Sequence, residues 1–239
     1  MRNPRALAAA MAVIALPLSA CSSGGSGSGN GSAGKETSNL PAATQLLSSG
    51  ATAMTAVQSV RFSINASGQI AGLALRSATG QLTRAGNAQG SASVSEAGAL
   101  VEINFVIVGS TAYIKGATGG YSKVPLQVAT AVYDPEAILD PNKGVVKLLQ
   151  TATGARTLDR ETLDGQSVYH VKALLAQPVL ATLVPGDSKS EEGDLWLTVS
   201  SSRLVKVAFP VETTSGGSGS VTASFSDFDA PATITAPSS

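Results

Sequence analysis

The chain has 239 residues, and its 16 basic and 16 acidic side chains cancel, so that charged residues make up only 13% of it. Proteins that bind nucleic acid need a basic face that displaces counterions, and stacking of bases or sugars needs aromatic platforms, but aromatic residues are only 4% of this chain. The composition therefore argues against a nucleic-acid partner and against an aromatic stacking platform.

The first twenty residues have the pattern of a bacterial signal peptide. Arg2 and Arg5 make its start positive, and the apolar run 6–16 is too short to cross a bilayer as a stable helix. The run leads to Leu18-Ser19-Ala20-Cys21, which matches a lipobox, where the cysteine thiol receives diacylglycerol and the chain is cut before the cysteine. An ordinary secretory signal with a stray cysteine is the alternative. We expect residues 1–20 to be removed and Cys21 to anchor the protein at the extracytoplasmic face of the plasma membrane, in the cell envelope.

Cys21 is the only cysteine, so its lipidation leaves the folded part without a thiol. Disulfides, cysteine-based metal sites and cysteine nucleophiles are therefore not expected. Residues 22–39 are mostly serine, glycine and other small polar residues, which bury nothing and lose much chain entropy on ordering. We expect the lipidated cysteine and a flexible tether at 21–39, followed by a single domain at 40–239.

Periodicity predicts one helix and a series of strands as far as about residue 124. Pro41–Val57 has apolar residues at three- and four-residue steps, as in a helix. Apolar and polar residues then alternate, as in half-buried strands joined by short turns. The expected strands are 60–64, 73–82, 89–96, 100–108 and 112–115. Their regular spacing favours an antiparallel meander.

The middle of the chain changes period. Asp134 is a candidate N-cap for a short helix that begins at Pro135, the segment 139–144 interrupts this helix, and 145–149 forms a second one. Strands then resume, and Leu163-Asp164-Gly165-Gln166 predicts a hairpin. The further expected elements are strands at 156–162, 167–173, 195–199, 204–211 and 221–228, a helix at 177–184, a hairpin tip at 215–219 and an extended tail along a sheet edge at 230–239.

This order of elements, together with the lipobox, resembles the LppX/LprA/LprF/LprG family of mycobacterial and related actinobacterial lipoproteins. The likeness runs from Cys21 to near the C-terminus, and its most specific part is Tyr133–Gly144. The shorter matching pieces are Ala71-Gly72-Leu73, Leu163-Asp164-Gly165, Leu195-Trp196-Leu197 and Ser226-Asp227-Phe228, where many members have tryptophan in place of Phe228.

The resemblance implies an α+β fold, in which short helices pack on the concave face of a strongly curved antiparallel half-barrel sheet of about ten strands. It also implies an apolar cavity between sheet and helices for the acyl chains of triacylated lipids, such as phosphatidylinositol mannosides, lipoarabinomannan or triacylglycerol. Members are linked to moving such lipids from the plasma membrane outward. The residues themselves, with a long apolar sheet face, few helices and few large aromatics, fit a hollow core, but small side chains that pack closely are the alternative.

The lining of such a cavity is expected to come from the apolar faces of the strands and helices. The strand candidates are Phe62, Ile64, Val94, Ile103, Phe105, Ile107, Val207 and Phe209. The helix candidates are Leu139, Val146, Leu149, Leu180 and Leu183.

No pattern in the chain predicts catalysis, a metal site or a cofactor. A G-x-S-x-G nucleophile elbow is absent from the sequence. His170 is the only histidine, and without cysteines or clustered carboxylates it is expected to be an exposed strand residue. Glu191, Glu192 and Asp194 are interpreted as a solvated loop before a strand.

Two further groups of polar residues can be interpreted either as structural or as functional. Asp134, Asp140 and Asn142 fit N-caps and turns better than a calcium loop, because nearby prolines break the alternating oxygen pattern such a loop needs. Lys143 and Lys147 either contact a lipid phosphate at the cavity mouth or belong to an ordinary exposed helix face.

The sequence thus predicts a lipid-binding, lipid-transferring lipoprotein without enzymatic activity. Its expected partners are a lipid or glycolipid ligand, the plasma membrane through Cys21, and a membrane lipid exporter. The alternative is a solid-cored envelope lipoprotein that acts by protein contact, as a transporter partner or an adhesin.

Overall fold

The structure, a computed structural model, describes residues 40–70, 72–96, 98–129, 135–184, 189–212 and 217–238. Contacts group Ser38–Ser239 into one compact unit, apart from Met1–Thr37. The expected signal peptide, Cys21 and the tether lie outside the described residues. Within the described part of the chain, no helix is both long enough and apolar enough to cross a membrane.

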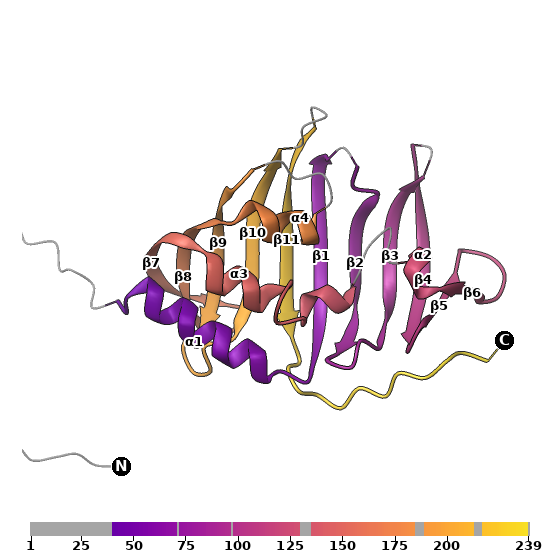
Figure 1. The fold of residues 1–239 in the computed structure, drawn as a ribbon, viewed down its shortest axis with the longest axis horizontal. Coiled ribbons are helices and arrows are strands. Elements are labelled where there is room, and N and C mark those ends of the chain that lie inside the picture. Colours follow the sequence, from indigo (N-terminus) through magenta and orange to yellow (C-terminus); the bar gives the residue numbers. More distant parts are fainter. Residues whose placement is uncertain are drawn as a thin grey trace, which may run out of the picture. The chain divides into compact units, whose positions relative to one another are not determined.

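Eleven strands form one antiparallel sheet (Figure 1). Their order is β6-β5-β4-β3-β2-β1-β11-β10-β9-β8-β7, so the first and last strands of the chain pair in the middle, and β6 and β7 are the two edges. The strands are β1 (Ser59–Gln69), β2 (Leu75–Thr83), β3 (Ala88–Glu96), β4 (Ala99–Val108), β5 (Thr111–Lys115), β6 (Ser122–Pro125), β7 (Thr153–Leu163), β8 (Gln166–Leu175), β9 (Glu191–Thr198), β10 (Leu204–Glu212) and β11 (Ser218–Ser226).

Each strand turns its apolar side chains to one face because side chains alternate along a strand. In β1, Phe62 and Ile64 are buried, and their register partners in β11 are Phe225 and Ala223. Directly opposite residues lie on the same face, so the apolar rows of the two halves of the chain merge into one apolar surface.

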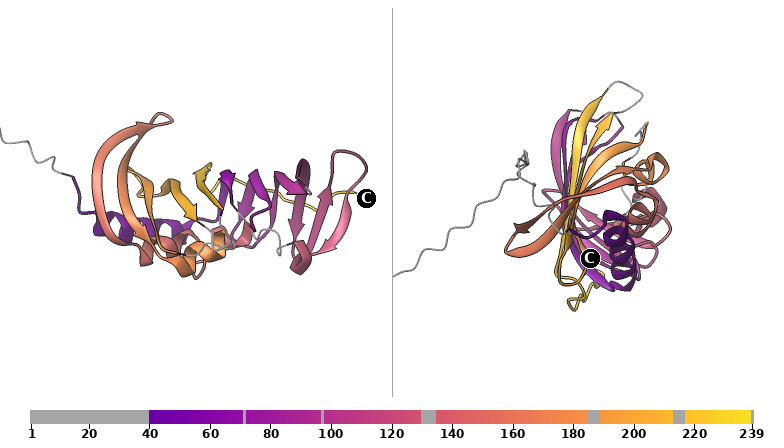
Figure 2. Two further views of the ribbon diagram at one scale, coloured as in Figure 1. Left: turned by 90° about the horizontal axis from the view of Figure 1, so that it is seen from above. Right: turned by 90° about the vertical axis from the view of Figure 1, so that its left-hand side faces the viewer.

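Short helices cover this surface (Figures 1 and 2). They are α1 (Ala43–Ala56), α2 (Leu126–Ala129), the 3₁₀ helix η1 (Pro135–Ile138), α3 (Val145–Thr151) and α4 (Gln177–Leu183). Helix α1 buries Leu46, Leu47, Ala51 and Met54 at the three- and four-residue steps of its sequence.

The predicted fold class, an open and curved antiparallel sheet with short helices on one face, is confirmed. The hairpin is confirmed as well: Asp164 (φ 49°) and Gly165 (φ 79°) both have the positive φ of a type I′ turn. The sequence missed the short elements β6 and α2, whose four residues each are too few for a periodic pattern.

The C-terminal tail differs from its expected course along a sheet edge. Residues 230–238 have no regular secondary structure, and they run past the lower ends of the strands (Figure 1). The tail is attached at its start, where Ser59 Oγ donates a 2.6 Å hydrogen bond to the carbonyl of Ala230. Asp134 and residues 215–216 of the expected hairpin tip lie outside the described residues.

Candidate functional site: the apolar interface of sheet and helices

An apolar cavity of about 40 Å³ lies where the helices meet the middle of the sheet. Every side chain that lines it is apolar, and these side chains come from β1, β2, β10 and β11 and their connections, and from the segments of η1, α3 and α4. They are Ile64, Ala66, Leu73, Leu75, Ile138, Val145, Leu148, Leu183, Val184, Val207, Phe209, Val221, Ala223 and Phe225. A volume of this size is close to that of a single water molecule, so the cavity is nearly closed in this conformation.

The predicted lining residues fall into three groups. Ile64, Leu183, Val207 and Phe209 line the cavity. Six others are buried in the surrounding core without lining it: Phe62, Ile107, Leu139, Val146, Leu149 and Leu180. The last three, Val94, Ile103 and Phe105, are half-buried on the same face of the sheet, beyond the cavity.

Half of the lining residues missed by the sequence reasoning lie on β11 and α3. Phe225 and Ala223 line the cavity because they are the register partners of Phe62 and Ile64. Their alternation with serine and threonine was visible in the sequence, but their position beside β1 depends on a pairing between strands about 160 residues apart.

The apolar surface continues from the cavity onto β3, β4 and β5. Leu75, which lines the cavity, has Val94 of β3 as its partner, and Val94 in turn pairs with Val101 of β4. Val94, Val101 and Ile103 are only half-buried there, whereas Ile64 and Val207 under the helices are buried. The interface therefore has a closed part under the helices and a partly open part beside them.

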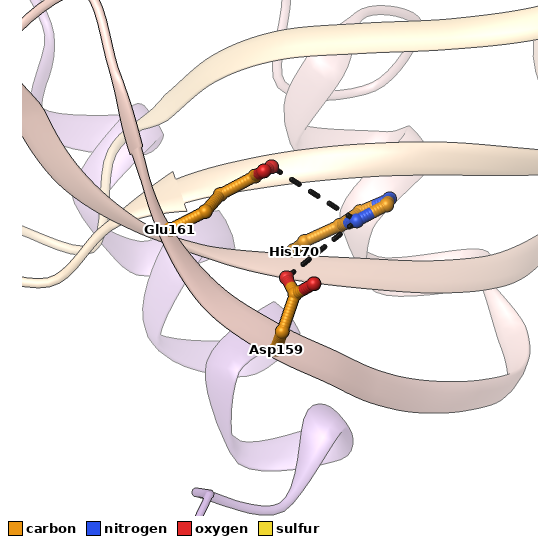
Figure 3. A group of neighbouring side chains, drawn as sticks. All are labelled: Asp159, Glu161 and His170. Carbon is orange, nitrogen blue, oxygen red and sulfur yellow. Dashed lines mark ion pairs between the residues drawn. The ribbon is translucent and has the colours of Figure 1, made fainter.

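A charged cluster lies around His170 on the opposite face of the sheet (Figure 3). His170 Nε2 is 2.8 Å from Asp194 Oδ1, and Nδ1 faces Asp159 Oδ1 at 3.7 Å and Glu161 Oε1 at 4.0 Å. The imidazole stacks on Trp196 with 4.7 Å between ring centroids. The expectation of a histidine without clustered carboxylates was wrong, because strand pairing brings together residues that are far apart in sequence.

This cluster has internal partners for its charges. Asp159, Glu161 and His170 each offer one possible metal-ligand atom, and these atoms lie within 4.8 Å of one another. However, Trp196 Nε1 donates to Glu161, and Lys172 Nζ lies 3.2 Å from Asp194. We interpret the cluster as cross-strand ion pairs and stacking that tie β7, β8 and β9 together.

Glu191, Glu192 and Asp194 lie within β9 and not in a loop, which corrects the expectation. The ladder between β8 and β9 continues to the pair Leu175–Glu191, so these acidic residues are paired strand residues. Nearby, the hydrogen bond from Lys189 Nζ to Glu212, at 2.7 Å, raises the pKa of Lys189 above its ordinary value.

The polar segment before α3 forms a turn. Asp140 Oδ1 accepts a 2.8 Å hydrogen bond from the backbone N–H of Asn142, in agreement with the turn expected here. Lys143 is exposed, with its Nζ 3.8 Å from Asp140, and Lys147 is half-buried.

Comparison with known proteins decides the family. The profile of the LppX_LprAFG lipoproteins matches residues 42–234, which is nearly the whole described domain. The chain belongs to this lipoprotein family. Among its relatives, the lipoarabinomannan carrier protein LprG of Mycobacteroides abscessus is 29% identical over 241 residues, 99% of each chain. LprG of Mycobacterium leprae is 26% identical over 202 residues, 83% of each chain.

Solved structures of family members have the same fold. LprF from Mycobacterium bovis superposes with a TM-score of 0.72 at 23% identity, over 82% of this chain and 97% of that one. LppX from Mycobacterium tuberculosis superposes with a TM-score of 0.61 at 16% identity, over 80% of this chain and 97% of that one. The family resemblance inferred from the sequence is thereby confirmed.

Proposed function

We propose that this protein is a lipid carrier, anchored in the membrane through Cys21, that binds acyl chains between its sheet and its helices and carries lipids toward the outer envelope. The observation that carries this proposal is the wholly apolar cavity at the sheet–helix interface, together with its half-buried continuation over β3 and β4. The lipoarabinomannan carriers among the relatives support a glycolipid or another acylated lipid as the ligand.

Binding of a chain requires the helices to move, because a cavity of about 40 Å³ cannot hold one. The covering elements η1, α3 and α4 are short, with four, seven and seven residues. Each buried methylene contributes about 0.8 kcal/mol, so a long acyl chain provides enough free energy to offset their displacement. The residues that would line the widened cavity include the buried predicted residues Val146, Leu149 and Leu180.

The second candidate function is protein contact by a solid-cored lipoprotein, as a transporter partner or an adhesin. The small volume of the cavity favours it, since the interior is already filled by side chains in this conformation. The two functions differ in one property: only the carrier contains lipid when isolated from a cell that makes its ligand.

Native mass spectrometry of the protein purified from an actinobacterial host separates the two functions. The test variant is Ala223→Trp, and its matched control is Ala208→Trp. Ala223 lines the cavity, whereas Ala208 is a half-buried residue of β10 on the opposite face. We expect wild type and Ala208→Trp to carry lipid, and Ala223→Trp to lose most of it because the indole occupies the site of the chain.

A wild-type protein that is consistently free of lipid would favour protein contact. In that case Ala223→Trp overpacks a solid core, and we expect it to lower the free energy of unfolding by about 1–3 kcal/mol without any effect on ligand content.

A further inference from the structure

A second hollow lies on the face of the sheet that carries no helix. It has a volume of about 610 Å³, within the range of roughly 300–1,000 Å³ that is typical of small-molecule sites. Its floor is formed by strands β10, β11, β1, β2, β3 and β4, and the tip of the β7–β8 hairpin also lines it. This hairpin curls away from the helices at one end of the sheet (Figure 2). Tyr121, in the connection between β5 and β6, also lines it. We call this hollow the trough.

The lining of the trough is part polar and part apolar, with little net charge. Gln81, Gln89, Asn104 and Gln166 contribute amides, which both donate and accept hydrogen bonds. Serine and threonine hydroxyls lie between them, and Val106 and Val205 add buried apolar patches to the floor. Of the charged lining residues, Arg61 is paired with Asp227 at 2.7 Å and Asp164 lies at the hairpin tip.

Much of this hydrogen-bonding capacity is unused. Within the described residues, the side-chain amides of Asn104 and Gln166 make no hydrogen bond to the protein, and the contact from Gln89 Nε2 to Gln81 Oε1 is long, at 3.5 Å. The charges of the cross-strand cluster at His170, on the same face, are paired instead. The trough thus presents neutral amides beside the aromatic rings of Tyr121, Phe62, Phe105 and Phe225.

The strand pairing argues against a peptide as the occupant. An extended peptide binds a sheet by pairing with an unpaired strand edge. The strands of the floor are all interior to the sheet, with neighbours on both sides, because the edges are β6 and β7. A ligand in the trough can therefore reach side chains only.

We propose that the trough binds an uncharged oligosaccharide. Sugar hydroxyls match the amides and hydroxyls as both donors and acceptors, and the apolar C–H face of a sugar ring suits Tyr121 and the valines of the floor. Among the described lining residues the one cation, Arg61, is already paired with Asp227, which disfavours a phosphate or carboxylate ligand. This site lies across the sheet from the lipid cavity, so the proposal does not depend on lipid binding.

Isothermal titration calorimetry of the full-length protein with linear trisaccharides of mannose, glucose and arabinose tests the proposal. We expect at least one of them to bind. Asn104→Ala and Gln89→Ala should each weaken binding about fivefold, the effect of one lost hydrogen bond, and Tyr121→Ala should weaken it further. Gln150→Ala, an exposed glutamine on α3, is the matched control and should leave the affinity unchanged.

Three outcomes would overturn the proposal. One is the absence of binding for all three sugars at millimolar concentration. Another is binding that the trough variants do not weaken although their thermal melts match wild type. The third is preferential binding of an extended peptide in the trough, with the same variants reducing its affinity and no sugar bound. Because lipid content is measured separately, none of these outcomes changes the conclusion on the lipid cavity.

Discussion

At the scale of single residues, Gly144 shows how closely the helices pack under the sheet. Its φ of −90° is negative, and the need for glycine arises from the space around it. A Cβ atom built on Gly144 would lie 2.0 Å from the carbonyl oxygen of Ala137 and 2.2 Å from that of Ile138. The segment of η1 and the start of α3 can therefore approach only through a residue without a side chain.

We expect Gly144→Ala to lower the free energy of unfolding by about 1–3 kcal/mol, because α3 must move away from η1 to admit the methyl group. Urea denaturation measures this change. The matched control is Gly116→Ala, since a Cβ there meets nothing within 4 Å. Equal stabilities of the two variants would contradict the close approach of η1 and α3.

At the scale of elements, Arg84 connects the helices to the sheet. From the turn between β2 and β3, its guanidinium donates to the carbonyls of Val57 at 2.7 Å and Met54 at 3.1 Å, at the end of α1. It also donates to the carbonyl of Leu139, between η1 and α3, at 3.4 Å. These carbonyls lie where α1 ends and just after η1 ends, so one side chain holds two helices of the cover in place.

Arg84→Ala should destabilise the protein by about 1.5–3 kcal/mol, the range for hydrogen bonds that involve a charged group. In addition, hydrogen exchange at the C-terminal end of α1 and at α3 should become faster than in wild type. Arg76→Ala serves as the control, because within the described residues Arg76 makes one long hydrogen bond, of 3.3 Å, to the carbonyl of Gly68. Unchanged exchange in these helices would show that Arg84 does not hold the cover.

At the scale of the whole molecule, the proposed carrier combines an anchored N-terminus with a domain that binds lipid. Two or more acyl chains on Cys21 would hold the protein stably on the membrane, whereas one chain binds only marginally. The expected tether of small polar residues at 22–39 joins this anchor to the domain. We therefore expect mutations of the anchor to leave lipid binding intact, and mutations of the cavity to leave membrane anchoring intact.

Cys21→Ala should release the protein from the membrane or leave it unprocessed, while lipid content and thermal stability of the domain stay at wild-type values. Metabolic labelling with a fatty acid, followed by membrane fractionation, measures the first effect, with Ser22→Ala as the control. Labelling of Cys21→Ala as strong as that of wild type would refute the lipobox interpretation.

Several features of the fold follow from local sequence alone. The helix at 43–56, most of the strands and the turn at Asp164-Gly165 were predictable, because a helical or alternating period and the turn chemistry of adjacent residues are local properties. The apolar face of β1, with Phe62 and Ile64, could be predicted for the same reason.

Only the tertiary structure decided which strands pair with one another and which helices cover each face of the sheet. A period of two tells which side chains of a strand share a face, but not which strand lies beside it. The pairing of β1 with β11 brings Phe225 and Ala223 to the cavity, and the pairing of β7, β8 and β9 gathers carboxylates around His170. The helices lie over β1 and β11 and not over β3 and β4, so Val94 and Ile103 are only half-buried. Their sequence pattern matches that of buried residues, but burial depends on what covers a face as well as on its composition.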